Sequence, residues 1–67
     1  MNVVINGETY QDLPKAITVA GLIKHLGLPE TKIAVERNLE IVSKSRFDQT
    51  ILSEGDTLEI IHFIGGG

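Results

Sequence analysis

One short amphipathic segment, residues 17–27, most constrains what this chain can fold into. Its apolar side chains recur at the i, i+3, i+4, i+7 spacing that gives a helix one buried stripe. That stripe is Val19, Leu22, Ile23 and Leu26. Thr18 suits the N-cap, and Gly27 suits the position just past the helix end. Because one stripe needs one covering surface, we expect a single helix packed on a single sheet.

Short apolar runs separated by turn signals predict the strands of that sheet. Asn6-Gly7 follows the first run and is a two-residue hairpin signal, since both positions tolerate a positive φ. The predicted strands are Met1–Ile5, Glu8–Leu13, Lys32–Arg37, Glu40–Val42 and Thr57–Ile64. The fold class is therefore α+β, with one mixed sheet of four or five strands packed on one amphipathic helix. We expect the first and last strands to lie side by side and parallel at its centre.

Residues 43–56 connect the predicted fourth strand to the last one. This segment is polar from Ser43 to Thr50 except at Phe47, which we expect to fill the edge of the core beneath an irregular or 3₁₀ stretch. Ile51 and Leu52 are predicted to fill the same edge of the core, and we call these three residues the plug. Gly55 marks a turn before the last strand, because glycine adopts a left-handed conformation readily.

Composition excludes several function classes. Sixty-seven residues make one domain, and the absence of cysteine excludes disulfides and cysteine metal sites. The net charge of −3 and scattered basic residues argue against nucleic-acid binding. We expect no bound metal and no catalytic residue, since no nucleophile–base pair, metal cluster or phosphate loop can be recognised. Without a secretory signal or a long apolar run, a cytoplasmic location is expected.

The predicted last strand is apolar on both faces. Leu58 and Ile60 are the better core candidates, because the opposite choice would bury Glu59. Ile61 and Phe63 then lie on the open face of the sheet, where we expect them near Val4 of the first strand. An exposed apolar patch on a small protein tends to mark a partner surface. The alternative is that the loop around Phe47, or the tail packing back, covers this face.

Three glycines follow Ile64, and we divide the chain into a domain, residues 1–64, and a flexible tail, residues 65–67. Glycine has no Cβ, so the tail backbone is thin and adopts many conformations. It can pass through a channel too narrow for side chains and present the carboxylate of Gly67. The alternative is a frayed end with no role, since loose termini are common.

Taken together, these features resemble the ubiquitin-like β-grasp sulfur carriers. The resemblance covers the whole chain and rests on the β-β-α-β-β-β order, the turn signals and the glycine tail. The residues that carry it are Asn6-Gly7, Gly55-Asp56, the run Ile33-Ala34-Val35 leading to Asn38, and the ending Glu59 to Gly67. No single internal motif is specific; the resemblance rests on the combination of small size, Gly55-Asp56, an apolar last strand and the terminal glycines. Within these carriers the chain looks most like the ThiS family, which serves thiazole synthesis in thiamine biosynthesis. Leu39 and Ser43 depart from the family pattern, which often has Gly and Pro there.

The resemblance implies a chemistry located at Gly67. In that family an adenylating enzyme of the ubiquitin-activating type (ThiF-type) uses ATP and Mg²⁺ to convert this carboxylate to an acyl-adenylate. Sulfur from a cysteine desulfurase then gives a thiocarboxylate, which supplies thiazole synthase (ThiG-type). The chain would be a protein co-substrate with no cofactor of its own. Gly65 and Gly66 would thread into the partner's site, and the docking residues would be Val4, Ile61, Phe63 and Ile64.

Three other readings stay open from the sequence. A carrier of another pathway, such as the small subunit of molybdopterin synthase, would share the tail and differ only in its acceptor. A ubiquitin-like protein modifier would join Gly67 to a lysine amine. A plain β-grasp interaction domain would carry an idle tail.

Overall fold

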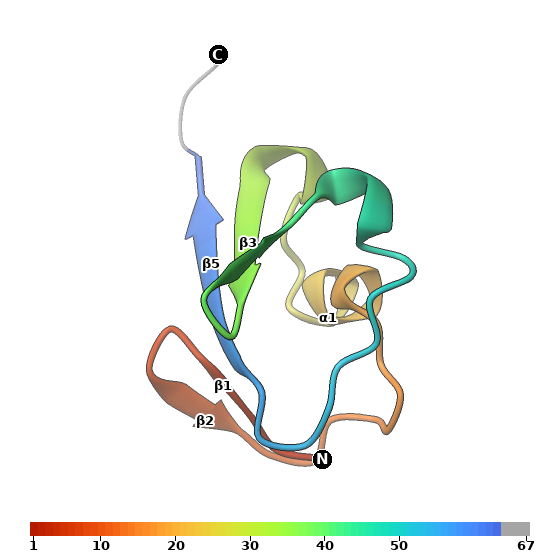
Figure 1. Ribbon diagram of the computed structural model, residues 1–67, viewed down its shortest axis with the longest axis vertical. Helices are drawn as coiled ribbons and strands as arrows, with labels where there is room; N and C mark the ends of the chain where they lie inside the picture. The colour runs from red at the N-terminus through yellow and green to blue at the C-terminus, as the bar shows by residue number, and fades with distance from the viewer. Residues whose placement is uncertain (64–67) are drawn as a thin grey trace.

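The structure is a computed structural model that describes residues 1–63 (Figure 1). Its strands are β1 (Val3–Ile5), β2 (Glu8–Tyr10), β3 (Ile33–Arg37), β4 (Glu40–Val42) and β5 (Thr57–His62). Its helix is α1 (Val19–His25), and two 3₁₀ turns are η1 (Glu30–Lys32) and η2 (Lys44–Arg46). The described chain therefore has the expected element order, with one helix and one sheet.

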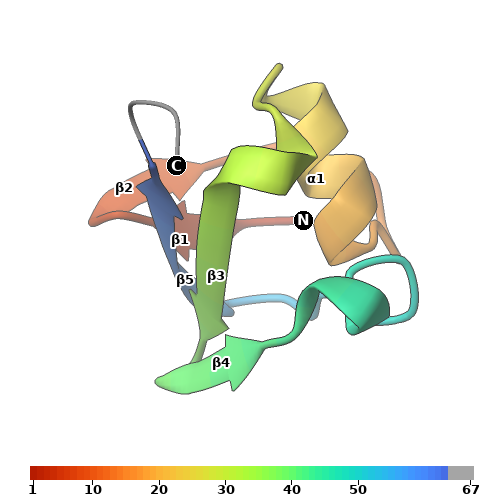
Figure 2. The ribbon, with the colours of Figure 1, turned by 90° about the horizontal axis from the view of Figure 1, so that it is seen from above.

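The strands form one mixed sheet in the order β2-β1-β5-β3-β4. β1 and β5 pair in parallel at its centre, and the other three pairings are antiparallel. Figure 2 shows α1 on one side of the sheet, together with the η2 segment, while no described element covers the opposite side. The expected α+β architecture, with five strands and the first and last adjacent and parallel, is confirmed.

Helix α1 forms as the sequence predicts. The Thr18 hydroxyl caps its first turn by accepting a hydrogen bond of 3.0 Å from the Gly21 N–H. Val19, Leu22 and Ile23 are buried against the sheet, and Leu26 is partly buried at the helix end. Gly27 follows with a φ of 72°, a left-handed conformation that glycine adopts without strain. The apolar stripe thus closes the core over one face of the sheet.

Some predicted boundaries are wrong. β2 stops at Tyr10 rather than Leu13, because Asp12 adopts a left-handed backbone with a φ of 62° that breaks the extended chain. Leu13 is nevertheless buried, and its N–H donates to the Met1 carbonyl. Lys32 belongs to η1, so β3 begins one residue later than predicted, at Ile33. β5 ends at His62, and Ile64 lies outside the described residues.

In the connection from β4 to β5, Phe47 is buried more deeply than expected and Ile51 is buried less deeply. Phe47 is fully buried, and its carbonyl accepts the Ala20 N–H at the start of α1. Leu52 is also buried, but Ile51 is about half exposed, so the prediction that Ile51 joins the plug is wrong. The reason is a local bridge between Ile51 and Thr18, an extended pairing in which successive side chains point to opposite sides.

Asp56 is the buried charged residue of the described chain, and it ties three segments together. Its carboxylate accepts hydrogen bonds from Arg37 Nε at 2.8 Å, Asn38 Nδ2 at 3.0 Å and the Ser53 N–H at 2.8 Å. Burial alone would raise the pKa of Asp56, but these hydrogen bonds and the charge of Arg37 hold the pKa below its ordinary value. The carboxylate therefore locks the end of β3 to the start of β5.

This network predicts an acid-dependent loss of stability. Because the folded-state pKa of Asp56 is depressed, its contribution is complete above the unfolded pKa, about 3.9, and is lost as the pH falls through the folded value. We expect Asp56→Asn to lower the free energy of unfolding at neutral pH by roughly 1–3 kcal/mol. The deficit should shrink on acidification below about pH 4, where the wild-type carboxylate also becomes neutral.

Urea unfolding followed by circular dichroism at several pH values measures this deficit. Asp48→Asn is the matched control, because Asp48 is exposed, and it should stay near wild type throughout. A deficit for Asp56→Asn that does not change with pH would contradict the assignment of the effect to the ionised carboxylate.

Candidate functional site: the open face of the sheet

The face of the sheet opposite α1 carries exposed apolar side chains near the end of β5. Leu58 and Ile60 point into the core, whereas Ile61 is 53% exposed and Phe63 is 52% exposed. Neither η2 nor the Phe47 segment covers them, because both lie on the helix side of the sheet (Figure 2). The predicted division of the last strand between core and open face is confirmed.

Val4 lies farther from these residues than expected. It is half-buried on β1, where its Cα pairs with Thr57 at the start of β5. Ile61 comes four residues later on β5, which corresponds to about 13 Å along an extended strand. The expectation that Val4 lies near Ile61 and Phe63 is therefore wrong, because the parallel register places it at the opposite end of β5.

A second group of exposed residues lies at the β3–β4 hairpin, and the sequence analysis did not single it out as a site. Leu39 is 90% exposed in the two-residue turn, and Ile41 on β4 is 79% exposed. Across the sheet Ile41 pairs with Glu36, and Glu36 pairs with Glu59 on β5. Alternation along the strands could have assigned these three side chains to one face of the sheet, but their alignment in one row depends on the register between strands. We call Glu36, Leu39, Ile41 and Glu59 the hairpin surface.

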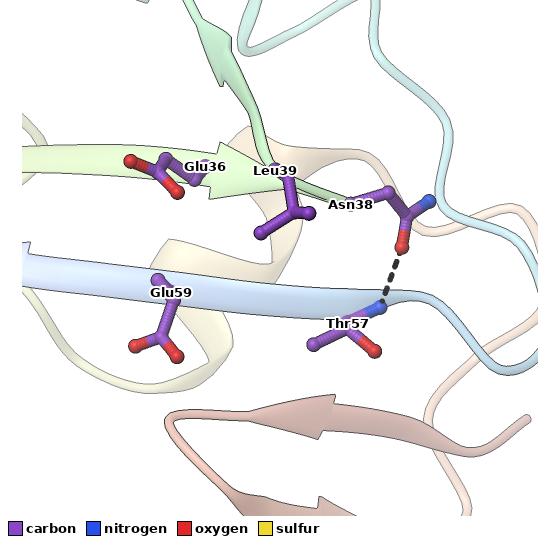
Figure 3. A pocket seen from close by; sticks show the side chains of 5 residues that line it. All are labelled: Glu36, Asn38, Leu39, Thr57 and Glu59. Atoms are coloured by element: carbon purple, nitrogen blue, oxygen red, sulfur yellow. Dashed lines mark hydrogen bonds between the residues drawn. The ribbon is translucent and has the colours of Figure 1, made fainter.

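Part of the hairpin surface surrounds a cavity of about 390 Å³ (Figure 3). Its lining residues are Glu36, Asn38, Leu39, Thr57 and Glu59. In Figure 3 the carboxylates of Glu36 and Glu59 lie on neighbouring strands, with the Leu39 side chain beside them. The cavity thus combines an apolar wall with two acidic groups.

Asn38 holds this turn against β5. Its N–H donates to the Thr57 carbonyl at 2.7 Å, and its side-chain oxygen accepts the Thr57 N–H at 2.9 Å. Its side-chain amide also donates to Asp56 at 3.0 Å. Both turn residues are left-handed, with φ of 50° at Asn38 and 71° at Leu39. Asparagine tolerates this conformation, but for leucine it costs roughly 1–2 kcal/mol.

Electrostatically, the open face is acidic at its centre. Glu36 and Glu59 stand directly opposite each other in the β3–β5 ladder, a placement that repels like charges. Among residues 1–63 the ion pair is formed elsewhere, between Arg37 and Asp56 on the core side. Within the described chain, therefore, no cation offsets this pair of carboxylates.

The predicted tail site lies outside the described residues. Ile64, Gly65, Gly66 and Gly67 are not among residues 1–63, so their roles as docking, threading and modified residues stay predictions. His25 and His62 are exposed, and across the described range no three potential metal-ligating side chains gather in one place. The described helix is also too short and too polar to cross a lipid bilayer.

Comparison with known proteins gives consistent matches. The sequence profile of the ThiS family matches residues 2–67. The sulfur carrier protein ThiS of Bacillus subtilis is 35% identical over 63 residues, covering 94% of this chain and 96% of that protein. A crystal structure of the thiamine biosynthesis protein ThiS from Geobacter metallireducens superposes with a TM-score of 0.84 at 32% identity, with both chains fully covered.

A longer relative aligns with the whole length of this chain. A thiazole synthase of Paramagnetospirillum magneticum is 51% identical over all 67 residues. The chain spans only 20% of that protein's length.

Phe63 on the open face and Phe47 in the core should contribute very differently to the free energy of unfolding. Phe63→Ala should lower the free energy of unfolding by about 1 kcal/mol or less, because Phe63 is half exposed. Phe47→Ala, the matched core variant, should cost about 3–5 kcal/mol, since it leaves a cavity. Chemical unfolding of both variants measures the difference, and equal losses would show that Phe63 belongs to the core.

Proposed function

The chain belongs to the ThiS family, and we propose that it is a sulfur carrier of thiamine biosynthesis whose Gly67 carries the sulfur as a thiocarboxylate. The observation that carries this proposal is a family match extending from residue 2 through the glycine tail to residue 67. The fold supports it, because the sheet and helix have the ubiquitin-like β-grasp arrangement of the ThiS crystal structure.

The proposed chemistry begins from an unreactive group. A terminal carboxylate has a pKa near 3.5, so it is ionised at neutral pH and is a poor electrophile. A carboxylate oxygen attacks the α-phosphate of ATP, pyrophosphate leaves, and Mg²⁺ on the activating enzyme offsets the phosphate charge. The terminal sulfur of a desulfurase persulfide then attacks the acyl carbon, forms a C–S bond and displaces AMP, which leaves an acyl disulfide. A second thiol attacks the desulfurase sulfur, breaks the S–S bond that came from the persulfide and forms a disulfide in its place, so that the thiocarboxylate is released.

The catalytic groups belong to the partner enzymes, and this chain supplies position and reach. The end of β5, with Ile61 and Phe63, offers an apolar docking surface beside the start of the tail. Three residues span about 10 Å when fully extended, which suffices to carry Gly67 from a docking surface into an enclosed site. Gly65 and Gly66 let the backbone follow a narrow channel, because they have no side chains.

Thiazole synthase is the proposed sulfur acceptor. The support is the Paramagnetospirillum thiazole synthase, which contains a segment 51% identical to this entire chain. A protein that carries such a segment within its own sequence keeps donor and acceptor at a high effective concentration. We propose that this chain serves the same acceptor, with the activating enzyme and a cysteine desulfurase acting before it.

Blocking the tail should stop loading without unfolding the domain. Gly66→Val adds a branched side chain where the backbone must pass through a narrow site, so we expect adenylation to fall roughly a hundredfold or more. ATP–pyrophosphate exchange with the activating enzyme measures this step, and Gly66→Ala should lie between the variant and wild type.

Unfolding curves provide the control for this experiment. Wild-type stability with lost exchange in Gly66→Val supports a threaded tail, whereas exchange at the wild-type rate would refute it. Wild-type chain that is never adenylated by the activating enzyme would refute the proposed function itself.

A further inference from the structure

We propose that the hairpin surface (Glu36, Leu39, Ile41 and Glu59) docks on thiazole synthase, where it receives a lysine or arginine side chain surrounded by apolar residues. This inference rests on the proposed function and extends it from the tail chemistry to the hairpin between β3 and β4. It assigns a recognition role to residues that neither the fold nor the tail chemistry requires.

Leu39 has an unfavourable backbone conformation for an exposed side chain. Its backbone is left-handed at a φ of 71°, and its side chain is 90% exposed, so no packing within the fold offsets the strain. A strained residue that its surroundings hold in place is often found at a binding or catalytic site. Exposed apolar side chains such as Leu39 and Ile41 lower solubility, but they stabilise a contact when a partner buries them.

The turn that carries Leu39 is held in place by hydrogen bonds. Asn38, its neighbour in the turn, makes three hydrogen bonds that fix it to Thr57 and Asp56. Asp56 in turn is anchored by Arg37 and Ser53. A side chain presented from a fixed turn loses little conformational freedom on binding, and that preorganisation favours affinity.

Two carboxylates lie beside Leu39. Glu36 and Glu59 face each other across β3 and β5, and in the described chain neither forms an ion pair. A basic side chain entering the cavity between them would remove their mutual repulsion. Leu39 would pack against the aliphatic part of a lysine or arginine, whose charged end would reach the carboxylates. The cavity of about 390 Å³ leaves room for such a side chain.

The hairpin surface is continuous with the rest of the open face. A stable interface involves roughly 20–30 residues on each side, more than Ile61, Phe63 and the tail can supply. The row Ile41, Glu36, Glu59 crosses the same uncovered face, and Ile61 follows two positions after Glu59 on β5. The face therefore extends without interruption from the tail end of β5 to the hairpin, and one partner can cover both.

We assign the hairpin surface to thiazole synthase rather than to the activating enzyme. The Paramagnetospirillum thiazole synthase joins a segment like this one to the rest of its chain, so the two parts share one molecule. A surface that recognises the acceptor also discriminates against other proteins, because a partner without the basic residue would leave two carboxylates buried and unpaired.

Binding to purified thiazole synthase, measured by calorimetry at low and high salt, tests the proposal. Leu39→Asn removes the apolar side chain but keeps a residue that tolerates the turn, and it should weaken binding roughly tenfold. The double variant Glu36→Gln, Glu59→Gln should also weaken binding roughly tenfold and reduce its dependence on salt. Glu30→Gln, an exposed acid on η1, is the matched control and should bind like wild type.

The unfolding midpoint separates a binding role from a structural one. If these residues only stabilised the fold, substituting them would lower the midpoint. Leu39→Asn should keep or raise the unfolding midpoint, because it relieves strain, and the double Gln variant should do the same by removing repulsion. Weaker binding at undiminished stability supports the proposal. The proposal is overturned if both variants bind with wild-type affinity or if their unfolding midpoints fall. It is also overturned if only binding to the activating enzyme is lost. Failure of the wild-type chain to bind thiazole synthase would instead refute the acceptor assigned under the proposed function.

Discussion

A single helix can cover only one face of a sheet, and this constraint explains most of the molecule. Helix α1 has one apolar stripe, and it closes the core over the inner faces of the five strands. β5 lies at the centre, so its inner residues are buried and its outer residues face the uncovered side. Leu58 and Ile61 thus differ in exposure because of strand alternation, although both are aliphatic. The open face is a direct consequence of the fold.

The polar network around Asp56 organises the edge of that face. The carboxylate fixes Arg37, Asn38 and Ser53, and Asn38 fixes the turn that presents Leu39. Its depressed pKa reflects how fully these donors satisfy the ionised form. Phe63, the last described residue, and the β3–β4 hairpin lie at opposite ends of the open face, and both positions depend on β5. A partner that binds the whole face would therefore hold the domain in one orientation while it binds the tail.

Local patterns predicted much of this structure. The helix, its Thr18 cap, the Gly55 turn and the division of β5 between two faces all follow from spacing and turn chemistry. Register does not, so the separation of Val4 from Ile61 could not be predicted. The network around Asp56 could not be predicted either, because Arg37 and Asn38 lie 19 and 18 residues away in sequence and the third donor is the backbone N–H of Ser53. Asn6 was expected only as a turn residue, yet its side-chain amide also pairs with the Ile60 backbone of β5.

The central claim is that sulfur resides on Gly67. The most direct measurement is the intact mass of the protein isolated from its own cells grown without external thiamine, followed by fragmentation. The account predicts a mass gain of one sulfur-for-oxygen exchange, located on the C-terminal fragment. A tail carrying only oxygen under those conditions, or a tail joined through Gly67 to lysines of other proteins, would contradict it.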